Sequence, residues 1–242
     1  MRAVLATYPY LFAGLLSSAF VLLVVRWRPL AAHRRMMIQL GLINVPSAIL
    51  LPLVGRDYWY PYRLGGGGLG VEDALCAFNV SAMGCLPAVL LFGERLIRPE
   101  GSGPKPQRLL TCGLLGVGSF LVQWSLGRSS MTSLIVTLLI GSAVLVSLRP
   151  GLWPAALACG LGFPLLYGAS VKAVLWVCPG FISSWTSAPP WGRLLFGIPL
   201  GETAWAAAFG VFWPLLAGYV FDLRLAARIP ASNHSHAGQV PQ

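Results

Sequence analysis

Three acidic residues of this chain lie where their neighbours are almost all apolar. Glu72 and Asp73 stand at the start of one long apolar run, and Glu202 stands near the start of another. Ionisable residues inside membrane helices are rare and usually functional, so acids at matching places in two runs indicate a chemical role. A carboxyl group in an apolar site can hold a proton at neutral pH and donate it. The structural alternative is that helix dipoles favour acids in the first turn.

Aromatic residues follow Glu202 at helical spacing. Trp205, Phe209, Phe212 and Trp213 recur three or four positions apart, so they share one face of a helix with the acid. The faces of aromatic rings attract cations. A proton donor beside such rings suits carbocation chemistry on a polyene. The alternative is packing of these rings against a neighbouring helix or lipid.

Two further polar residues lie inside apolar runs. Lys172 lies about six residues before the end of its run, and a lysine in hydrocarbon should find a partner. We expect it to pair with Glu202 or with Glu72 and Asp73; the alternative is that it reaches the membrane surface. Asn79 shares a helical face with Glu72, seven residues earlier, and either contacts substrate or joins two helices.

The composition places these residues in a membrane protein. Of the 242 residues, 56% are hydrophobic and 10% are charged, with a mean hydropathy of +0.72. A soluble domain would need more charge to cover its surface. The net charge of +10 does not predict nucleic-acid binding, because the basic residues fall in short connections between apolar runs. We predict an all-α integral membrane protein in contact with the lipid bilayer.

Seven apolar segments approach the length of about 20 residues that crosses a bilayer core. The predicted spans are 8–25, 36–54, 71–93, 108–126, 131–148, 152–178 and 197–221. Eleven basic residues fall on one side of these spans and five on the other. Because basic residues concentrate on the cytoplasmic side, we predict an N-terminus outside and a cytoplasmic C-terminus.

The chain also contains an internal repeat. Arg63 and Glu72 recur 130 residues later as Arg193 and Glu202. Spans one to three then match spans five to seven in the same orientation, which predicts two parallel three-helix repeats joined by a connecting helix. The substrate site is expected between the repeats. The predicted divisions are a first repeat at 1–98, a linker and connecting span at 99–130, a second repeat at 131–228 and a disordered tail at 229–242.

The order of these features resembles that of a known family. The first half contains the aromatic segment 57–60, a glycine-rich stretch, the pair Glu72 and Asp73, and the pair 94–95 after the apolar run. The second half contains the matching features in the order Trp185, 191–199, Glu202 and Asp222. The chain therefore resembles the membrane-embedded, non-flavin lycopene cyclase domain family, which occurs as paired subunits or fused tandem domains.

Both copies depart from the family motif, Pro-x-Glu-(Glu/Asp)-x-x-Phe-Phe. The first copy has Gly70 in place of the proline, and Cys76 and Ala77 in place of the aromatic pair. The second copy keeps Pro199 but has Gly201 at the position of the first acid.

The motif alignment pairs the acid at 202 with Asp73, whereas the 130-residue offset pairs it with Glu72. The sequence leaves this choice open.

The resemblance implies a redox-neutral isomerisation, in which an intramolecular lyase cyclises lycopene or a related linear carotene. A carboxylic acid protonates the terminal double-bond region, the cation closes on a nearby alkene, and a base removes a proton. The catalytic candidates are Glu72, Asp73 and Glu202, and the candidates for substrate binding are Lys172, Asn79, Trp205, Phe209 and Trp213. The partner is a hydrophobic polyene, and no metal or other cofactor is implied.

Three other functions fit parts of the pattern. A carotenoid-binding or partner subunit without activity would explain the altered motifs. A small transporter can have three-plus-one-plus-three helices, although no series of polar residues marks a path. A retinal protein would also have seven spans, but Lys172 lies in the sixth. The sequence leaves open whether the chain forms homo- or hetero-oligomers.

Overall fold

The computed structural model of the chain describes residues 8–55, 57–64, 66, 68–99 and 103–226. The predicted tail at 229–242 lies outside these residues. Almost all regular structure is helical. The α-helices are α2 (Pro9–Arg26), α3 (Arg34–Asn44), α4 (Leu51–Val54), α5 (Val71–Met83), α6 (Leu86–Phe92), α7 (Pro106–Ser125), α8 (Ser130–Leu148), α9 (Trp153–Val177) and α10 (Leu200–Phe221).

Shorter elements connect these helices. The 3-10 helices are η1 (Arg28–Leu30), η2 (Val45–Leu50), η3 (Gly93–Arg95), η4 (Pro150–Leu152) and η5 (Pro179–Ser184). The strands, each two residues long, are β1 (Leu96–Ile97), β2 (Leu194–Leu195), β3 (Ile198–Pro199) and β4 (Arg224–Leu225). Proline stands in the first turn of α2, α6, α7 and α9, where the absent N–H removes one of the donors that a helix start leaves unpaired.

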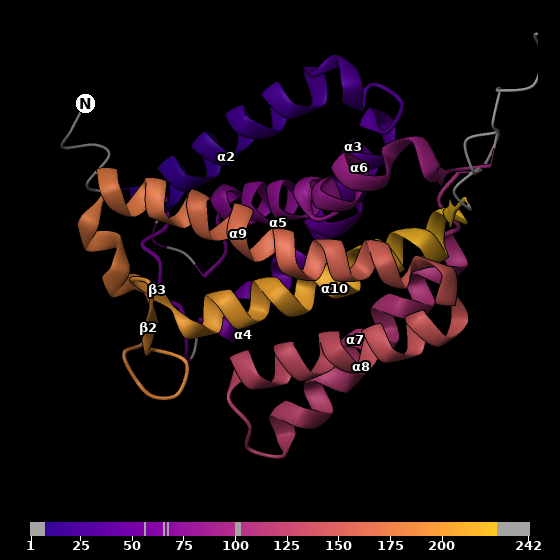
Figure 1. Cartoon of the computed structure of the whole chain (residues 1–242). Coiled ribbons are helices and arrows are strands. Elements are labelled where there is room, and N and C mark those ends of the chain that lie inside the picture. The colour runs from indigo at the N-terminus through magenta and orange to yellow at the C-terminus, as the bar shows by residue number, and fades with distance from the viewer. Residues whose placement is uncertain (1–7, 56, 65, 67, 100–102, 227–242) are drawn as a thin grey trace, which may run out of the picture.

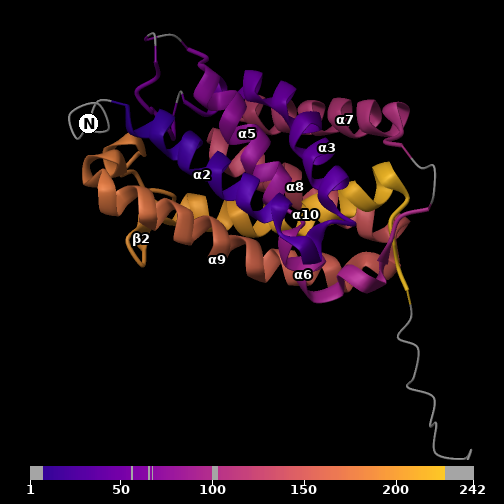
Figure 2. The same ribbon diagram turned by 90° about the horizontal axis from the view of Figure 1, so that it is seen from above.

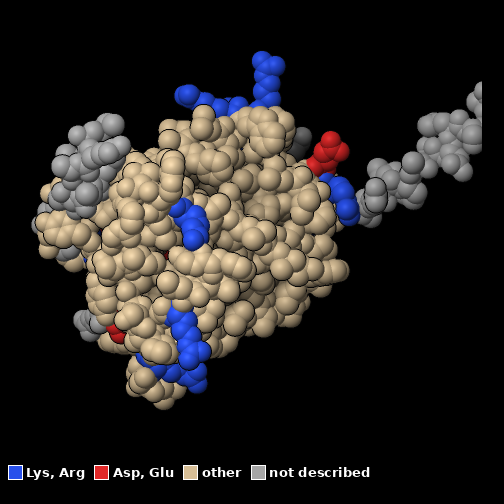
Figure 3. Space-filling model, turned by 60° about the vertical axis from the view of Figure 1, so that its left-hand side comes forward, with Lys and Arg blue, Asp and Glu red and all other residues tan. Residues whose placement is uncertain are grey.

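Six helical segments are long and apolar enough to cross a membrane. These segments are Pro9–Arg26, Arg34–Val54, Val71–Arg95, Ser130–Leu148, Pro150–Val177 and Leu200–Phe221. Helix α7 occupies the place of the predicted fourth span, but it is not among the six. Uncharged residues cover most of the face shown in Figure 3, as a surface in contact with lipid requires. The prediction of an all-α integral membrane protein is therefore consistent with the fold.

The two segments that begin with acids form the centre of the molecule. Leu200–Phe221 is 67% buried and Val71–Arg95 is 56% buried, whereas each of the other four spans is at most 28% buried. Helix α10 packs against α9 and α8, and α5 packs against α3 and α2. Figures 1 and 2 show α10 and α5 inside the bundle, with α7 beside α8 at its edge.

Two backbone pairings join the first half of the chain to the second. Before α5 and α10 begin, Trp59 and Trp185 form an antiparallel bridge, with hydrogen bonds from Tyr60 N to Ser184 O (2.6 Å) and from Thr186 N to Tyr58 O (2.8 Å). After α6 and α10 end, β1 and β4 pair antiparallel. We call the first end the carboxylate end of the bundle and the second the basic end.

An ion cluster fixes the basic end. Asp222, directly after α10, has a left-handed φ of 55° and a side chain that is 18% exposed. Its carboxylate forms ion pairs with Lys105, with Arg108 (2.7 Å) and with Arg149. Hydrogen bonds from these three side chains, that of Lys105 foremost, hold the pKa of Asp222 well below its ordinary value. The cluster therefore ties α7, α8 and α10 together.

Replacing Asp222 by Asn should lower the free energy of unfolding by about 1–2 kcal/mol at pH 7, because three cations lose their anion at a partly exposed site. Asn tolerates the left-handed conformation, so the change isolates the charge. Since the folded-state pKa is depressed, the stabilisation is complete above the unfolded value of about 4 and is lost as pH falls below it. Thermal unfolding of purified protein across this pH range would measure it. Arg224→Gln, which removes an exposed charge nearby, serves as the control, and an equal loss in both variants would contradict the expectation.

Candidate functional site

Glu202 is the third residue of α10 and is only 6% exposed. The hydroxyl of Tyr167, on α9, donates to Oε2 at 2.5 Å, and Nε1 of Trp185 donates to Oε1 at 2.9 Å. Among the described residues, no basic side chain forms an ion pair with it. Glu202 is thus a buried carboxyl group whose hydrogen-bond partners are uncharged.

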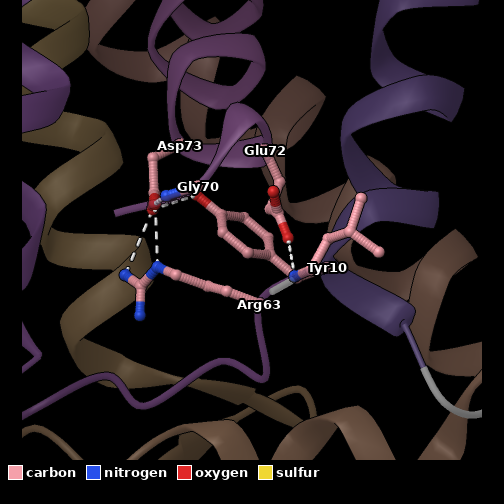
Figure 4. A network of polar contacts seen from close by, with 6 residues as sticks. Tyr10, Arg63, Gly70, Glu72 and Asp73 are labelled. Carbon is pink, nitrogen blue, oxygen red and sulfur yellow. Dashed lines mark hydrogen bonds and ion pairs between the residues drawn. The ribbon is translucent and has the colours of Figure 1, made fainter. Parts of the chain in front are cut away.

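Asp73 is the third residue of α5 and is fully buried, but it has a cationic partner (Figure 4). Arg63 donates from Nε to Oδ2 at 2.8 Å and from Nη2 to Oδ1 at 3.1 Å. The hydroxyl of Tyr10 donates to Oδ1 at 3.0 Å, and the amide of Gly70 donates to Oδ2 at 2.7 Å. This bidentate pair and the two further donors satisfy an ionised carboxylate.

Glu72 lies next to Asp73 but has a different environment. Its Oε1 accepts from the amide of Leu64, whereas its buried Oε2 has no hydrogen-bond partner among the described residues. The side chain folds back over Gly70, because a Cβ at that glycine would lie 2.5 Å from Oε2. Figure 4 shows Glu72 directed towards the loop before α5. Glu72 therefore holds this loop against the helix.

An apolar cavity of about 90 Å³ lies between α2, α5 and α9. Tyr10 and Tyr167 both line it. The hydroxyl of Tyr10 donates a hydrogen bond to Asp73, and that of Tyr167 donates one to Glu202. The other aromatic residues of its wall are Phe20, Trp59, Phe163, Phe181 and Trp185. The acids do not line the cavity themselves, so the tyrosines separate them from its interior.

Tyr10 and Tyr167 are site residues that no sequence motif marks. A tyrosine within an apolar span needs a partner for its hydroxyl, and that requirement is the signal that could have identified Tyr10 and Tyr167. In the sequence, Trp185 belongs to a loop of the family resemblance, and Arg63 stands out through the repeat alone.

Asn79 lies in the cavity wall, as a substrate contact would. It also connects two helices, because its Nδ2 donates to Gly14 O at 3.0 Å and to Ser18 Oγ at 2.9 Å. Asn79 therefore joins α5 to α2, as one of the two alternatives expects, and its contact with a substrate stays a prediction.

The aromatic stripe of α10 forms a stack outside the cavity wall. Ring centroids are 5.2 Å apart for Tyr167 and Trp205, 5.3 Å for Trp205 and Phe209, and 4.8 Å for Phe209 and Trp213. Nε1 of Trp213 donates to Ser81 O of α5 at 2.8 Å. The stripe therefore packs α10 against its neighbours, and its first ring, Trp205, packs against Tyr167.

Lys172 does not reach the acids. It is exposed, and its Nζ lies beside Gly197, where an added Cβ would be 2.7 Å away. The pairing with Glu202, Glu72 or Asp73 is absent because Lys172 lies five residues after Tyr167 on α9. Five residues turn a helix by about 140° beyond a full turn, which directs the lysine away from the side that Tyr167 faces.

The helix starts distinguish the two alignments of the copies. Helix α5 begins at Val71 and α10 at Leu200, so Asp73 and Glu202 each occupy the third helical position and each accept a tyrosine hydroxyl. This correspondence favours the motif alignment, in which Gly201 takes the position of Glu72.

Tyr58 occupies the space beside Gly201. It is 1% exposed, and a Cβ at Gly201 would lie 2.5 Å from its hydroxyl oxygen and 2.7 Å from Cζ. Burial raises the pKa of Tyr58, so its hydroxyl keeps its proton. This hydroxyl has no hydrogen-bond partner among the described residues. A phenol from the first half of the chain thus stands beside Glu202 where the first copy carries a second acid.

Comparisons with protein-family models, curated proteins and solved structures find no match for this chain. In the part of the chain that the structure describes, no three His, Cys, Asp or Glu residues are grouped to hold a metal ion. The chemistry of the site therefore has to be inferred from its own residues.

Replacing Gly201 by Ala should lower the free energy of unfolding by about 1–3 kcal/mol, because the new methyl group overlaps the ring of Tyr58. The matched control is Gly113→Ala on the exposed α7, where an added Cβ has no neighbour within 4 Å and helix propensity favours alanine. Thermal unfolding of both variants in detergent would test this. If Gly201→Ala unfolded at the same temperature as the unchanged protein, the close contact with Tyr58 would be wrong.

Proposed function

We propose that this protein is an integral membrane enzyme that cyclises an end group of a linear polyene of the lycopene type by proton transfer. The observation that carries the proposal is the arrangement around the cavity. Glu202, a buried acid without a cation, lies behind Tyr167, and Asp73, a buried acid with Arg63 as its cation, lies behind Tyr10. Such unequal environments suit one acid and one base.

The acid step uses the pair formed by Glu202 and Tyr167. A carboxyl group that is buried without a counter-ion favours its neutral, protonated form. Tyr167 gives its hydroxyl proton to a terminal carbon of the polyene and receives the proton of Glu202. The electrons of one double bond form the new C–H bond, and a tertiary carbocation remains. The low polarity of the cavity excludes water, which would otherwise trap the cation.

The ring closes inside the aromatic wall. The electrons of a neighbouring double bond attack the cation and form a C–C bond, which moves the positive charge to another carbon. Trp59, Phe163, Phe181 and Trp185 present rings to this charge. A proton next to the new cationic carbon then leaves to Tyr10, whose own proton passes to Asp73. Its electrons form the ring double bond, so no oxidant or reductant is consumed.

The size of the cavity suits one end of a long substrate. A volume of about 90 Å³ accommodates only part of an end group, so the rest of a carotene would extend along α2 and α9 into lipid. Phe20 and Val21 of α2 and Leu166 and Ser170 of α9 would contact it there. This arrangement supports a lipid-soluble substrate over a water-soluble one.

We also propose that α7 is a seventh span that joins two parallel repeats, with the carboxylate end outside. The support is the correspondence of the halves. Helices α5 and α10 are both central, each follows one partner of the bridge between Trp59 and Trp185, and each precedes one partner of the β1–β4 pair. The basic residues near β1, α7 and α8 favour a cytoplasmic basic end.

A second candidate function is carotenoid binding without chemistry. It is favoured by the hydrogen bonding of the site, because each tyrosine already donates to an acid and neither acid lines the cavity. The two functions differ in whether a bound polyene is changed.

Expression of the chain in a host that accumulates lycopene should yield a cyclised carotene. Glu202→Gln should reduce this product by at least about a hundredfold, since a general acid contributes that much or more. Glu94→Gln makes the same substitution at an exposed acid of the basic end and should retain activity. Carotenoid analysis by chromatography, with immunoblots to confirm membrane levels, would measure the effect. Unchanged lycopene in the presence of the unsubstituted protein would favour the binding function instead.

The source of the proton can be tested directly. Protein in lipid vesicles that contain lycopene, transferred to deuterated buffer, should insert one deuterium for each ring formed, because Glu202 exchanges with solvent between turnovers. Mass spectrometry of the product would count the label. A cyclised product without deuterium would contradict the proposed acid step.

A further inference from the structure

Tyr58 is a buried phenol that the proposed proton transfer does not use. It lies between α4 and α5, in the first half of the chain, and is only 1% exposed. Its ring packs over the start of α10, because a Cβ at Gly201 would lie 2.5 Å from the hydroxyl oxygen and 2.8 Å from Cε2. The hydroxyl therefore lies against the residue that directly precedes Glu202.

Backbone contacts with the second half hold Tyr58 in this place. Its carbonyl accepts from the amide of Thr186 at 2.8 Å. The next residue, Trp59, forms the bridge with Trp185, whose Nε1 donates to Glu202. The bridged loops therefore bring one side chain from each half of the chain to the same acid.

The hydroxyl of Tyr58 is within electrostatic reach of Glu202, yet it has no aligned hydrogen bond among the described residues. A carboxylate offers about four positions to hydrogen-bond donors. The hydroxyl of Tyr167 and Nε1 of Trp185 occupy two of them. Hydrogen bonds that act in catalysis are often poorly aligned in a structure without substrate and tighten during the reaction. Glu202 can therefore accept a third donor.

A third donor matters most when Glu202 is charged. Under the proposed acid step, Glu202 is neutral at rest and becomes a buried carboxylate when its proton passes to Tyr167. No basic side chain of the described residues pairs with this charge. The thiol of Cys76, on α5, is also within electrostatic reach of Glu202, but a thiol is a weak donor. An interaction that is stronger in the charged state than at rest accelerates the chemical step.

We propose that Tyr58 is a positioning residue of the acid step, which donates a hydrogen bond to the carboxylate of Glu202 as the proton of Glu202 passes to Tyr167. Tyr58 keeps its own proton throughout. This role rests on the proposed function, because Tyr58 acts through Glu202. It also gives a reason for the difference between the two copies. A second acid in the place of the phenol would repel the carboxylate that the phenol stabilises.

The test compares Tyr58→Phe with Tyr62→Phe, the same substitution at a tyrosine nearby in the chain that is 57% exposed. Each variant keeps the ring and loses one hydroxyl, so thermal unfolding should show that both fold as the unchanged protein does. The first measurement is the rate of lycopene cyclisation by purified protein in lipid vesicles of increasing lycopene content. The second is infrared difference spectroscopy, which follows the carbonyl band of protonated Glu202 as the pH is raised. Its absence in Glu202→Gln identifies this band.

We expect Tyr58→Phe to lower kcat about a hundredfold and to leave KM unchanged, because it removes one donor to a developing charge. It should also retain the band of protonated Glu202 to a pH about one unit higher, because the carboxylate has lost a partner. Tyr62→Phe should change neither quantity. A purely structural role of Tyr58 would leave the infrared band unmoved.

The two measurements separate this inference from the proposed function. If the unchanged protein leaves lycopene uncyclised, the proposed function fails, and the infrared titration still decides whether Tyr58 stabilises the carboxylate of Glu202. If the protein is active, an unchanged kcat in Tyr58→Phe would overturn the inference alone. An infrared band that does not move in Tyr58→Phe would overturn it in either case.

Discussion

The structure depends on the burial of two carboxylates among membrane helices. Lipid offers no hydrogen bonds, so each acid must find its partners within the protein. Asp73 obtains them from Arg63, Tyr10 and Gly70. Glu202 obtains them from two aromatic side chains of the second half. These requirements determine where the loops before α5 and α10 lie, and they bring α2 and α9 to the same cavity.

The two acids meet this requirement in different ways, and under the proposed function this difference decides which one gives a proton and which one takes it. Asp73 has a cation at ion-pair distance, whereas the partners of Glu202 are neutral. Tyr58 reinforces the contrast. It comes from the first half, crosses to α10 through the bridged loops and fills the place that a second acid would take at Gly201. The two halves therefore complete one composite site.

Much of the fold could be predicted from the sequence, but the partners of the acids could not. Apolar runs indicate the spans directly, and a carboxylate at the start of a run is visible without a structure. The environment of Glu202 depends on residues 17 and 35 positions away, which the packing of α9 against α10 and the path of the loop between them bring together. Lys172 shows the same limit of sequence-based prediction. Its depth along α9 suggested a partner, but the helical phase, which depth does not reveal, directs it outward.

The balance of acidic and basic side chains differs between the two ends of α5 and α10, and this difference bears on the proposed function. At the carboxylate end, Arg63 has a dedicated acid and no described cation pairs with Glu202. At the basic end, Asp222 alone serves three cations, so positive charge remains in excess. Under the proposed function, a carbocation intermediate would form at the carboxylate end, where a mobile anion would trap it. The excess cations, whose counter-ions would be such anions, lie at the far end of both helices. The length of these two helices therefore separates the proposed proton chemistry from the excess positive charge, so the electrostatic requirements of the two ends do not conflict.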